Sequence, residues 1–191
     1  MIVLGLCGSL RPGSFNLRLL EAAGAALAPE HRLVVFDGLA DVAPYVEGAT
    51  TPPAVARLLE AIAAADAVLV ATPEYNASVP GQLKNALDWV SRPFPANALR
   101  AKPVAVVGAS TGLFGAVWAQ AELRKILGTI GADVLDADLP VGRAHGAFGA
   151  DGGLVDAGLA GRLEALLADL VGRARPPKTG FSQPIQAGQG R

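Results

Sequence analysis

Short apolar runs that alternate with longer Ala- and Leu-rich stretches are the feature that most restricts how this chain can fold. The apolar runs, rich in β-branched residues, cover residues 2–8, 32–36, 67–71, 103–108 and 133–137. The stretches that read as helices cover residues 16–28, 53–65, 81–91, 114–131 and 154–171. Strands that are apolar on both faces are typical of parallel sheets covered by helices on both sides. The alternation therefore predicts a doubly wound α/β domain with a five-stranded parallel sheet.

The length of the chain fits one domain followed by a short tail. Its 191 residues are 51% hydrophobic, which suffices for a substantial core and excludes general disorder. After Val171 the sequence becomes rich in Pro, Gly and Gln. We therefore predict one domain over residues 1–171 and a tail over residues 172–191, and we hypothesise that this tail packs against a second subunit.

Charge and cysteine content exclude several classes of function. The formal net charge is −1 and the 16 basic residues are scattered, which is unlike the basic stripe of a nucleic-acid binder. Two histidines and one cysteine form no cluster with metal-ligand spacing. No apolar run reaches the ~18 residues of a membrane span, and the N-terminus lacks the basic flank of a signal peptide. The single cysteine, Cys7, agrees with a reducing compartment, so we expect a cytoplasmic protein. From the charge, the histidine count and the apolar run lengths, we expect no metal, nucleic-acid or membrane partner.

Three loops are expected to share one edge of the sheet. In an open parallel sheet, ligands bind beyond the carboxyl ends of the strands, near the point where the strand order reverses. The loops that follow the first, third and fourth predicted strands cover residues 8–15, 72–80 and 109–113. Each loop has an unusual composition, and together they form the candidate site.

The first loop, with the sequence GSLRPGSFN over residues 8–16, predicts an anion site. It nearly fits the P-loop pattern, but Ser14 stands where the lysine would be, which favours a single phosphate over a nucleoside triphosphate. Ser9, Ser14 and Asn16 offer polar groups beside the N-terminus of a helix. Arg11 adds a guanidinium suited to phosphate. The alternative is that Ser14 or Asn16 only caps the helix and Arg11 is solvated.

The second loop has the sequence TPEYNASVPG over residues 72–81. Two prolines stiffen it, and Tyr75 and Asn76 place an aromatic ring and an amide at its centre, as a planar heteroaromatic ligand requires. The alternative is a turn in which Asn76 adopts an unusual backbone conformation and Tyr75 fills a surface groove. Because this loop is expected to lie beside the first loop, we favour the ligand-binding interpretation over the simple turn.

The third loop raises a rival hypothesis. The sequence GASTG at residues 108–112 matches the G-x-S-x-G nucleophile elbow of α/β-hydrolases, and aspartates and then His145 follow it in the order of such enzymes. A serine esterase that uses Ser110 is therefore a second candidate. Against it, the aspartates fall at the fifth strand and leave little room for further strands. We favour Ser110 as a small turn residue that lets a ligand approach closely.

Three segments of the chain resemble the NADPH-dependent FMN reductase family, a flavodoxin-like group that includes quinone and chromate reductases. The segments are GSLRPGSFN, TPEYNASVPGQLKNALDW and GASTGLFGAVWAQAELRKIL, in that order and at family-like separations. The resemblance extends over most of residues 1–171 and implies a flavodoxin-like sheet with the strand order 2-1-3-4-5. It also implies FMN as the bound cofactor and NADPH or NADH as the co-substrate.

The resemblance implies positions for the cofactor as well. The implied cofactor-binding residues are Ser9, Arg11, Ser14, Phe15 and Asn16 for the phosphate; Pro73, Glu74, Tyr75 and Asn76 for the isoalloxazine and ribityl chain; and Ser110, Thr111 and Gly112 for the other side of the ring system. No residue is assigned as a catalytic acid or base, since the flavin carries the chemistry.

Two further expectations concern subunits and one departure from the family. Family members are usually dimers or tetramers with the flavin near a subunit boundary, which implies a homodimer or homotetramer here. The candidate interface is the helix that contains LKNALDW, with Trp89 at a rim or interface. At residues 115–120 the sequence GAVWAQ places Trp118 where the family often has an arginine. Trp118 supplies no positive charge, so any contact made by that arginine is in doubt.

The resulting prediction is an oxidoreductase that transfers a hydride from NAD(P)H through bound FMN to a small acceptor. A quinone, a free flavin, an azo compound and a metal oxyanion all remain open as the acceptor. The alternatives are the serine esterase and a flavodoxin-like electron carrier without NAD(P)H turnover. Flavodoxins tend to be acidic, and the net charge of −1 argues against the carrier.

Overall fold

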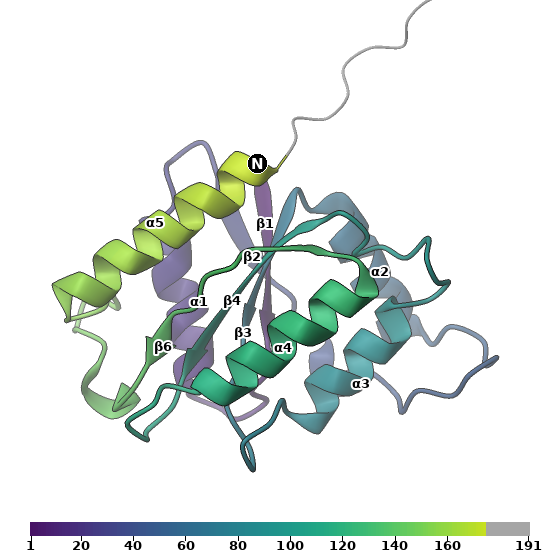
Figure 1. The fold of residues 1–191 in the computed structure, drawn as a ribbon, viewed down its shortest axis with the longest axis horizontal. Coiled ribbons are helices and arrows are strands. Elements are labelled where there is room, and N and C mark those ends of the chain that lie inside the picture. The colour runs from purple at the N-terminus through teal and green to yellow at the C-terminus, as the bar shows by residue number, and fades with distance from the viewer. Residues whose placement is uncertain (175–191) are drawn as a thin grey trace, which may run out of the picture.

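A computed structural model describes residues 1–174, which form a parallel sheet between two layers of helices (Figure 1). The strands are β1 (Ile2–Cys7), β2 (Arg32–Val35), β3 (Ala67–Ala71), β4 (Pro103–Ala109), β5 (Asp133–Val134) and β6 (Pro140–Val141). The helices are α1 (Phe15–Ala26), α2 (Pro53–Ala64), α3 (Gly81–Val90), α4 (Val117–Ile130) and α5 (Ala157–Arg173). Helix α5 runs two residues past the predicted end of the domain, and the rest of the predicted tail lies outside the described residues, apart from Ala174.

The strand order confirms the predicted fold class. The sheet runs β2-β1-β3-β4-β5, and every pairing along it is parallel. This is the flavodoxin-like arrangement, in which the order reverses between β1 and β3. The chain leaves β1, β3 and β4 at the same edge, so the three loops singled out from the sequence meet there.

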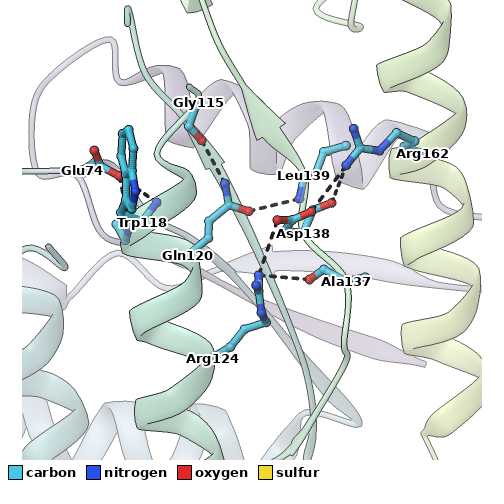
Figure 2. A network of polar contacts seen from close by, with 10 residues as sticks. Glu74, Gly115, Trp118, Gln120, Arg124, Ala137, Asp138, Leu139 and Arg162 are labelled. Carbon is cyan, nitrogen blue, oxygen red and sulfur yellow. Dashed lines mark hydrogen bonds and ion pairs between the residues drawn. The ribbon is translucent and has the colours of Figure 1, made fainter. Parts of the chain in front are cut away.

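The predicted fifth strand is wrong in extent. Instead of one strand over residues 133–137, β5 and β6 each have two residues, and both pair with β4. Between them, Leu135 and Leu139 are buried, while Asp138 forms ion pairs with Arg124 and Arg162 outside the sheet (Figure 2). Aspartate is disfavoured in strands, and these ion pairs hold the segment away from a continuous ladder.

Two helices begin later than the sequence predicts. Helix α4 starts at Val117 rather than at residue 114, because Gly115 and Ala116 both have left-handed backbones, with φ of 57° and 62°. Helix α5 starts at Ala157 rather than at residue 154, and its N-cap is Asp156, whose carboxylate accepts from the amide of Leu159. Local turn conformation therefore shortens both helices at their N-termini.

Two hydrophobic clusters cover the two faces of the sheet. On one face, α2, α3 and α4 pack against side chains such as Leu4, Val68 and Val104. On the other face, α1 and α5 pack against alternate positions such as Val3 and Leu69. This alternation is the period of two expected for a sheet buried on both sides. Among residues 1–174, no helix is long and apolar enough to cross a membrane.

Helix α3 holds the long connection of residues 37–52 against the domain. Trp89 is only 7% exposed, and its Nε1 donates to the carbonyl of Ala43 at 2.8 Å. Gln82 donates to the carbonyls of Leu39 and Val42, each at 2.8 Å. The expectation that Trp89 lies at a rim or interface is therefore wrong, because the ring is buried within its own chain.

Candidate functional site

A cavity of about 310 Å³ lies between the three loops at the carboxyl ends of β1, β3 and β4. Its lining residues are Ser9, Arg11, Ser14, Phe15, Asn16, Pro73, Glu74, Tyr75, Ala109, Ser110 and Thr111. All the residues predicted for the site are in this lining except Asn76 and Gly112, and Ala109 is an addition. The volume falls in the range of ligand pockets, which starts at about 300 Å³.

The first loop presents a helix N-terminus together with the guanidinium of Arg11. Ser14 is the N-cap of α1, and its Oγ accepts from the amide of Asn16 at 3.2 Å. The first turn of α1 holds no acidic residue. The guanidinium of Arg11 lies 5.4 Å from the centroid of the Phe15 ring and, within residues 1–174, has no carboxylate partner. An anion placed here would meet both positive charge and backbone N–H groups.

Asn16 has a role that the sequence did not reveal. Its side chain is 3% exposed and pairs at both ends with one residue of the third loop. Nδ2 donates to the carbonyl of Ala109 and Oδ1 accepts from its amide, each at 2.9 Å. The two residues are 93 positions apart, so this pair fixes the start of α1 against the end of β4.

Cys7 lies directly before the first loop and behaves as a core residue. It packs against the cluster on the α1 and α5 face, and its Sγ donates to the carbonyl of Ser9 at 3.4 Å. Burial raises the pKa of the Cys7 thiol. A raised pKa keeps the thiol protonated near neutral pH, so the environment of Cys7 does not favour a nucleophilic thiolate.

The second loop is a tight hairpin. Tyr75 and Ser78 exchange two backbone hydrogen bonds of 3.1 Å each, and both residues between them have left-handed backbones. Asn76 has φ 54° and Ala77 has φ 60°, the conformation of a two-residue primed turn. The alternative interpretation of Asn76, an unusual backbone conformation, is thus confirmed. Tyr75 is 50% exposed at the cavity.

Glu74 connects the second loop to helix α4. Its Oε2 accepts from the amides of Trp118 and Ala119, each at 3.1 Å (Figure 2). Helix α4 has no side-chain cap of its own, since its N-cap position is Ala116. The carboxylate therefore caps α4 from a position 44 residues away. Local sequence around α4 holds no signal for this cap.

We expect Glu74→Ala to lower the free energy of unfolding by about 1 kcal/mol, the usual loss for a removed helix cap. Urea unfolding of the purified protein measures this loss. The matched control is Glu164→Ala on the exposed face of α5, which should leave the unfolding free energy unchanged. Equal effects of the two substitutions would contradict the capping role of Glu74.

The third loop is fixed against the segment that follows β5. The amide of Ser110 donates to the carbonyl of Val141 at 3.0 Å, and the amide of Arg143 donates to the carbonyl of Gly112 at 2.8 Å. Gly115 is required here, because a Cβ on it would lie 2.5 Å from the backbone of Pro140. The segment that contains β6 thereby fixes the position of the third loop through backbone hydrogen bonds.

Gln120 completes this support from inside the domain. The side chain is fully buried, with Nε2 donating to the carbonyl of Gly115 at 2.9 Å and Oε1 accepting from the amide of Leu139 at 3.1 Å (Figure 2). Both bonded groups are backbone groups that would otherwise lack partners. The sequence analysis did not single out Gln120 for this role.

Sequence similarity to known proteins identifies the family of this chain. Residues 1–146 match the family model described as NADPH-dependent FMN reductase. The chain belongs to the NADPH-dependent FMN reductase family. An NAD(P)H-dependent FMN reductase from Pseudomonas aeruginosa is 43% identical over 158 residues, which cover 81% of this chain and 84% of that protein. A quinone reductase from Escherichia coli is 38% identical over 138 residues, 70% of this chain and 73% of that protein.

A solved structure agrees with these relatives of the FMN reductase family. The chain is similar to a flavoenzyme NAD(P)H:(acceptor) oxidoreductase from Paracoccus denitrificans, with a TM-score of 0.80 and 34% sequence identity. The superposition covers 91% of this chain and 96% of that one.

The serine esterase hypothesis has no support in this member of the FMN reductase family. Within the described residues, no hydrogen bond joins the Ser110 hydroxyl to a histidine or a carboxylate, and His145 is exposed in a short 3-10 turn. Ser110 is instead anchored through its backbone to the segment after β5. The G-x-S-x-G match reflects a tight turn after β4.

A larger cavity, of about 610 Å³, lies at the opposite edge of the sheet. Several of its charged lining residues are engaged within the protein: Asp133 pairs with Arg173 at 3.3 Å, and Lys102 donates to the carbonyl of Ala65. Partial burial lowers the pKa of Lys102. The strands begin at this edge, whereas ligands of open parallel sheets bind where strands end, so size alone does not make it the site.

Proposed function

We propose that this chain is an FMN-containing oxidoreductase that transfers a hydride from NAD(P)H to a small-molecule acceptor. The observation that carries the proposal is the meeting of three loops at one cavity, in a chain that belongs to the NADPH-dependent FMN reductase family. The lining combines the Arg11 guanidinium and a helix N-terminus without an acidic residue in its first turn with the aromatic ring of Tyr75. This donor set fits a cofactor with one terminal phosphate and a planar ring.

The cavity divides into a phosphate end and a ring end. The phosphate end consists of Ser9, Arg11, Ser14, the backbone of Phe15 and Asn16, of which Arg11 supplies the charge. We assign Pro73, Glu74 and Tyr75 to one side of the ring end and Ser110 and Thr111 to the other, and we place Asn76 and Gly112 next to them, outside the lining. The side chains of Asn16 and Glu74 are already bonded within the protein, which supports a positioning role for both.

The chemistry divides between the cofactor and the chain. Bound FMN supplies the centre that takes a hydride from NAD(P)H and passes it on. For a quinone acceptor, the hydride brings two electrons and one proton, and a second proton from solvent completes the hydroquinone. The residues of the chain bind and orient the reactants, which raises the rate by fixing their geometry. No acid or base of the chain is needed in this scheme.

Three finer points extend the proposal. The quinone reductase named among the relatives supports a quinone as the acceptor, while both NADPH and NADH stay open as the donor. We further propose a homodimer or homotetramer in the cytoplasm. The single cysteine of the chain suits a reducing compartment.

Anaerobic spectroscopy of the purified protein tests the proposal. We expect a yellow protein whose flavin absorbance bleaches rapidly on addition of NADPH or NADH and returns when 1,4-naphthoquinone is added. Bound flavin that ignores both nucleotides would identify an electron carrier instead. A protein that binds no FMN but reacts with a fluorophosphonate at Ser110 would restore the esterase.

A further inference from the structure

Exposed apolar side chains lie on, or directly after, two of the loops that line the cavity, and one of them, Tyr75, is in the lining itself. Tyr75 is 50% exposed, Leu113 61%, Phe114 57% and Trp118 51%. Tyr75 comes from the second loop and Leu113 from the third. Phe114 lies in the turn before α4, and Trp118 lies in the first turn of α4. Burial of such side chains is favourable, so a compact group of them beside a cavity points to a ligand or a partner.

Two of these side chains form an ordered aromatic pair. The rings of Phe114 and Trp118 lie 5.1 Å apart between centroids, edge to face at 65°. The backbone of Trp118 is tied to Glu74, the neighbour of Tyr75 in the second loop, and Figure 2 shows the indole beside the Glu74 carboxylate. The turn at Gly115 is held in turn by Gln120. The pair is therefore held close to Glu74, which lines the cavity.

The charges of these two loops disfavour an anionic ligand. Residues 72–81 and 109–123 contain no Lys, Arg or His, and their two acids are Glu74 and Glu122. Glu74 caps α4, and Glu122 accepts from the Ser78 hydroxyl at 2.7 Å. Arg143 adjoins the third loop through its backbone amide at Gly112. An oxyanion would find no cation in either loop, whereas an uncharged aromatic ring would find matching surfaces.

We propose that Phe114 and Trp118, with Tyr75, form a platform that selects planar, uncharged aromatic acceptors over anionic ones. The proposal rests on the proposed function, because the acceptor must reach the ring end of the same cavity. Tyr75 lines that cavity, and the amide of Trp118 is bonded to Glu74, which lines it as well. Three side chains suit one ring system, whereas a stable protein interface uses about 20–30 residues on each side, so a second copy of the chain fits less well.

Acceptor selectivity tests the platform in the FMN-loaded enzyme. We compare kcat/KM for 1,4-naphthoquinone, a neutral planar acceptor, with kcat/KM for ferricyanide, an anion without an aromatic ring. Trp118→Ala should lower the ratio of the two by roughly three- to tenfold, the loss expected for one aromatic contact, mainly through KM for naphthoquinone. Trp118→Phe should recover most of the ratio. The matched control is Phe94→Ala, since Phe94 is 61% exposed beyond the far end of α3.

A binding measurement separates the platform from turnover. Calorimetric titration of the oxidised, FMN-loaded enzyme with 1,4-naphthoquinone, without NAD(P)H, should show a weaker Kd for Trp118→Ala by a similar factor. An unchanged ratio and an unchanged Kd in Trp118→Ala would overturn the platform, as would a change of oligomer size in that variant, which would assign the surface to a second copy. Anaerobic flavin reduction by NADPH in the wild type reports on the proposed function separately, so either idea can fail alone.

Discussion

Replacing Asn16 with leucine is expected to lower the free energy of unfolding by about 2–4 kcal/mol. Leucine has a similar size but cannot pair with Ala109, whose amide and carbonyl both bond to the Asn16 side chain. Each buried group left without a partner costs about 1–3 kcal/mol. Thermal or urea unfolding of the FMN-free chain measures the loss. FMN affinity should fall as well, because the same pair holds the first loop against the third.

A second buried asparagine provides the control. Asn97 is 7% exposed, its Nδ2 donates to the carbonyl of Ile130 at 3.0 Å, and its Oδ1 accepts from the amide of Leu99 at 3.0 Å. It is absent from the lining of the cavity. Asn97→Leu should therefore cost similar stability but leave FMN affinity unchanged. If both variants lose affinity equally, Asn16 has no special link to the site.

Arg11→Ala should weaken FMN binding by about 1.5–3 kcal/mol, or about 10- to 150-fold in Kd, the value of a hydrogen bond to a charged group. Arg11 is exposed, with its guanidinium over the Phe15 ring, so its removal should leave the unfolding free energy nearly unchanged. Titration of the FMN-free protein with FMN, followed by flavin fluorescence, gives the affinity directly. Arg11→Lys should recover part of the loss, because lysine keeps the charge without the planar fork.

The matched control for Arg11 lies on α1, the helix that follows the first loop. Arg18 stands over the Phe148 ring, at 4.7 Å from its centroid, much as Arg11 stands over Phe15, but it does not line the cavity. Arg18→Ala removes the same charge from the same region. Similar FMN affinities in Arg11→Ala and Arg18→Ala would show that a general positive potential, rather than a direct contact, accounts for the binding.

Regular elements of the fold could be predicted because their signals are local. The continuous apolar run at β3, AVLVA, is buried along its whole length, and the Leu and Ala spacing of α1 and α5 matches one face of the sheet. The fifth strand failed for the opposite reason. Its apolar residue Leu135 is buried, but the path of the chain after it depends on ion pairs of Asp138 with arginines from two other elements, α4 and α5.

For the candidate site, the location could be predicted from the sequence, whereas the roles of three residues that fix its loops could not. Its location followed from one topological rule, that ligands bind beyond the carboxyl ends of parallel strands, together with the composition of three loops. The roles of Asn16, Glu74 and Gln120 could not be predicted, because their partners lie 93, 44 and 19 residues away along the chain or in an irregular turn. A side chain with such a distant partner looks, in sequence, like any other polar residue near a loop.

The residues that fix the loops differ from the rim, by which we mean the platform residues Tyr75, Phe114 and Trp118. Asn16 and Gln120 are buried, whereas the three rim side chains are exposed. Exposed positions tolerate substitution with small changes in stability. Point mutations at the rim can therefore redirect the enzyme to a new acceptor without disturbing the frame that holds the cofactor. In evolutionary terms, acceptor choice in this domain is a trait that can change quickly while the fold and its cofactor site persist.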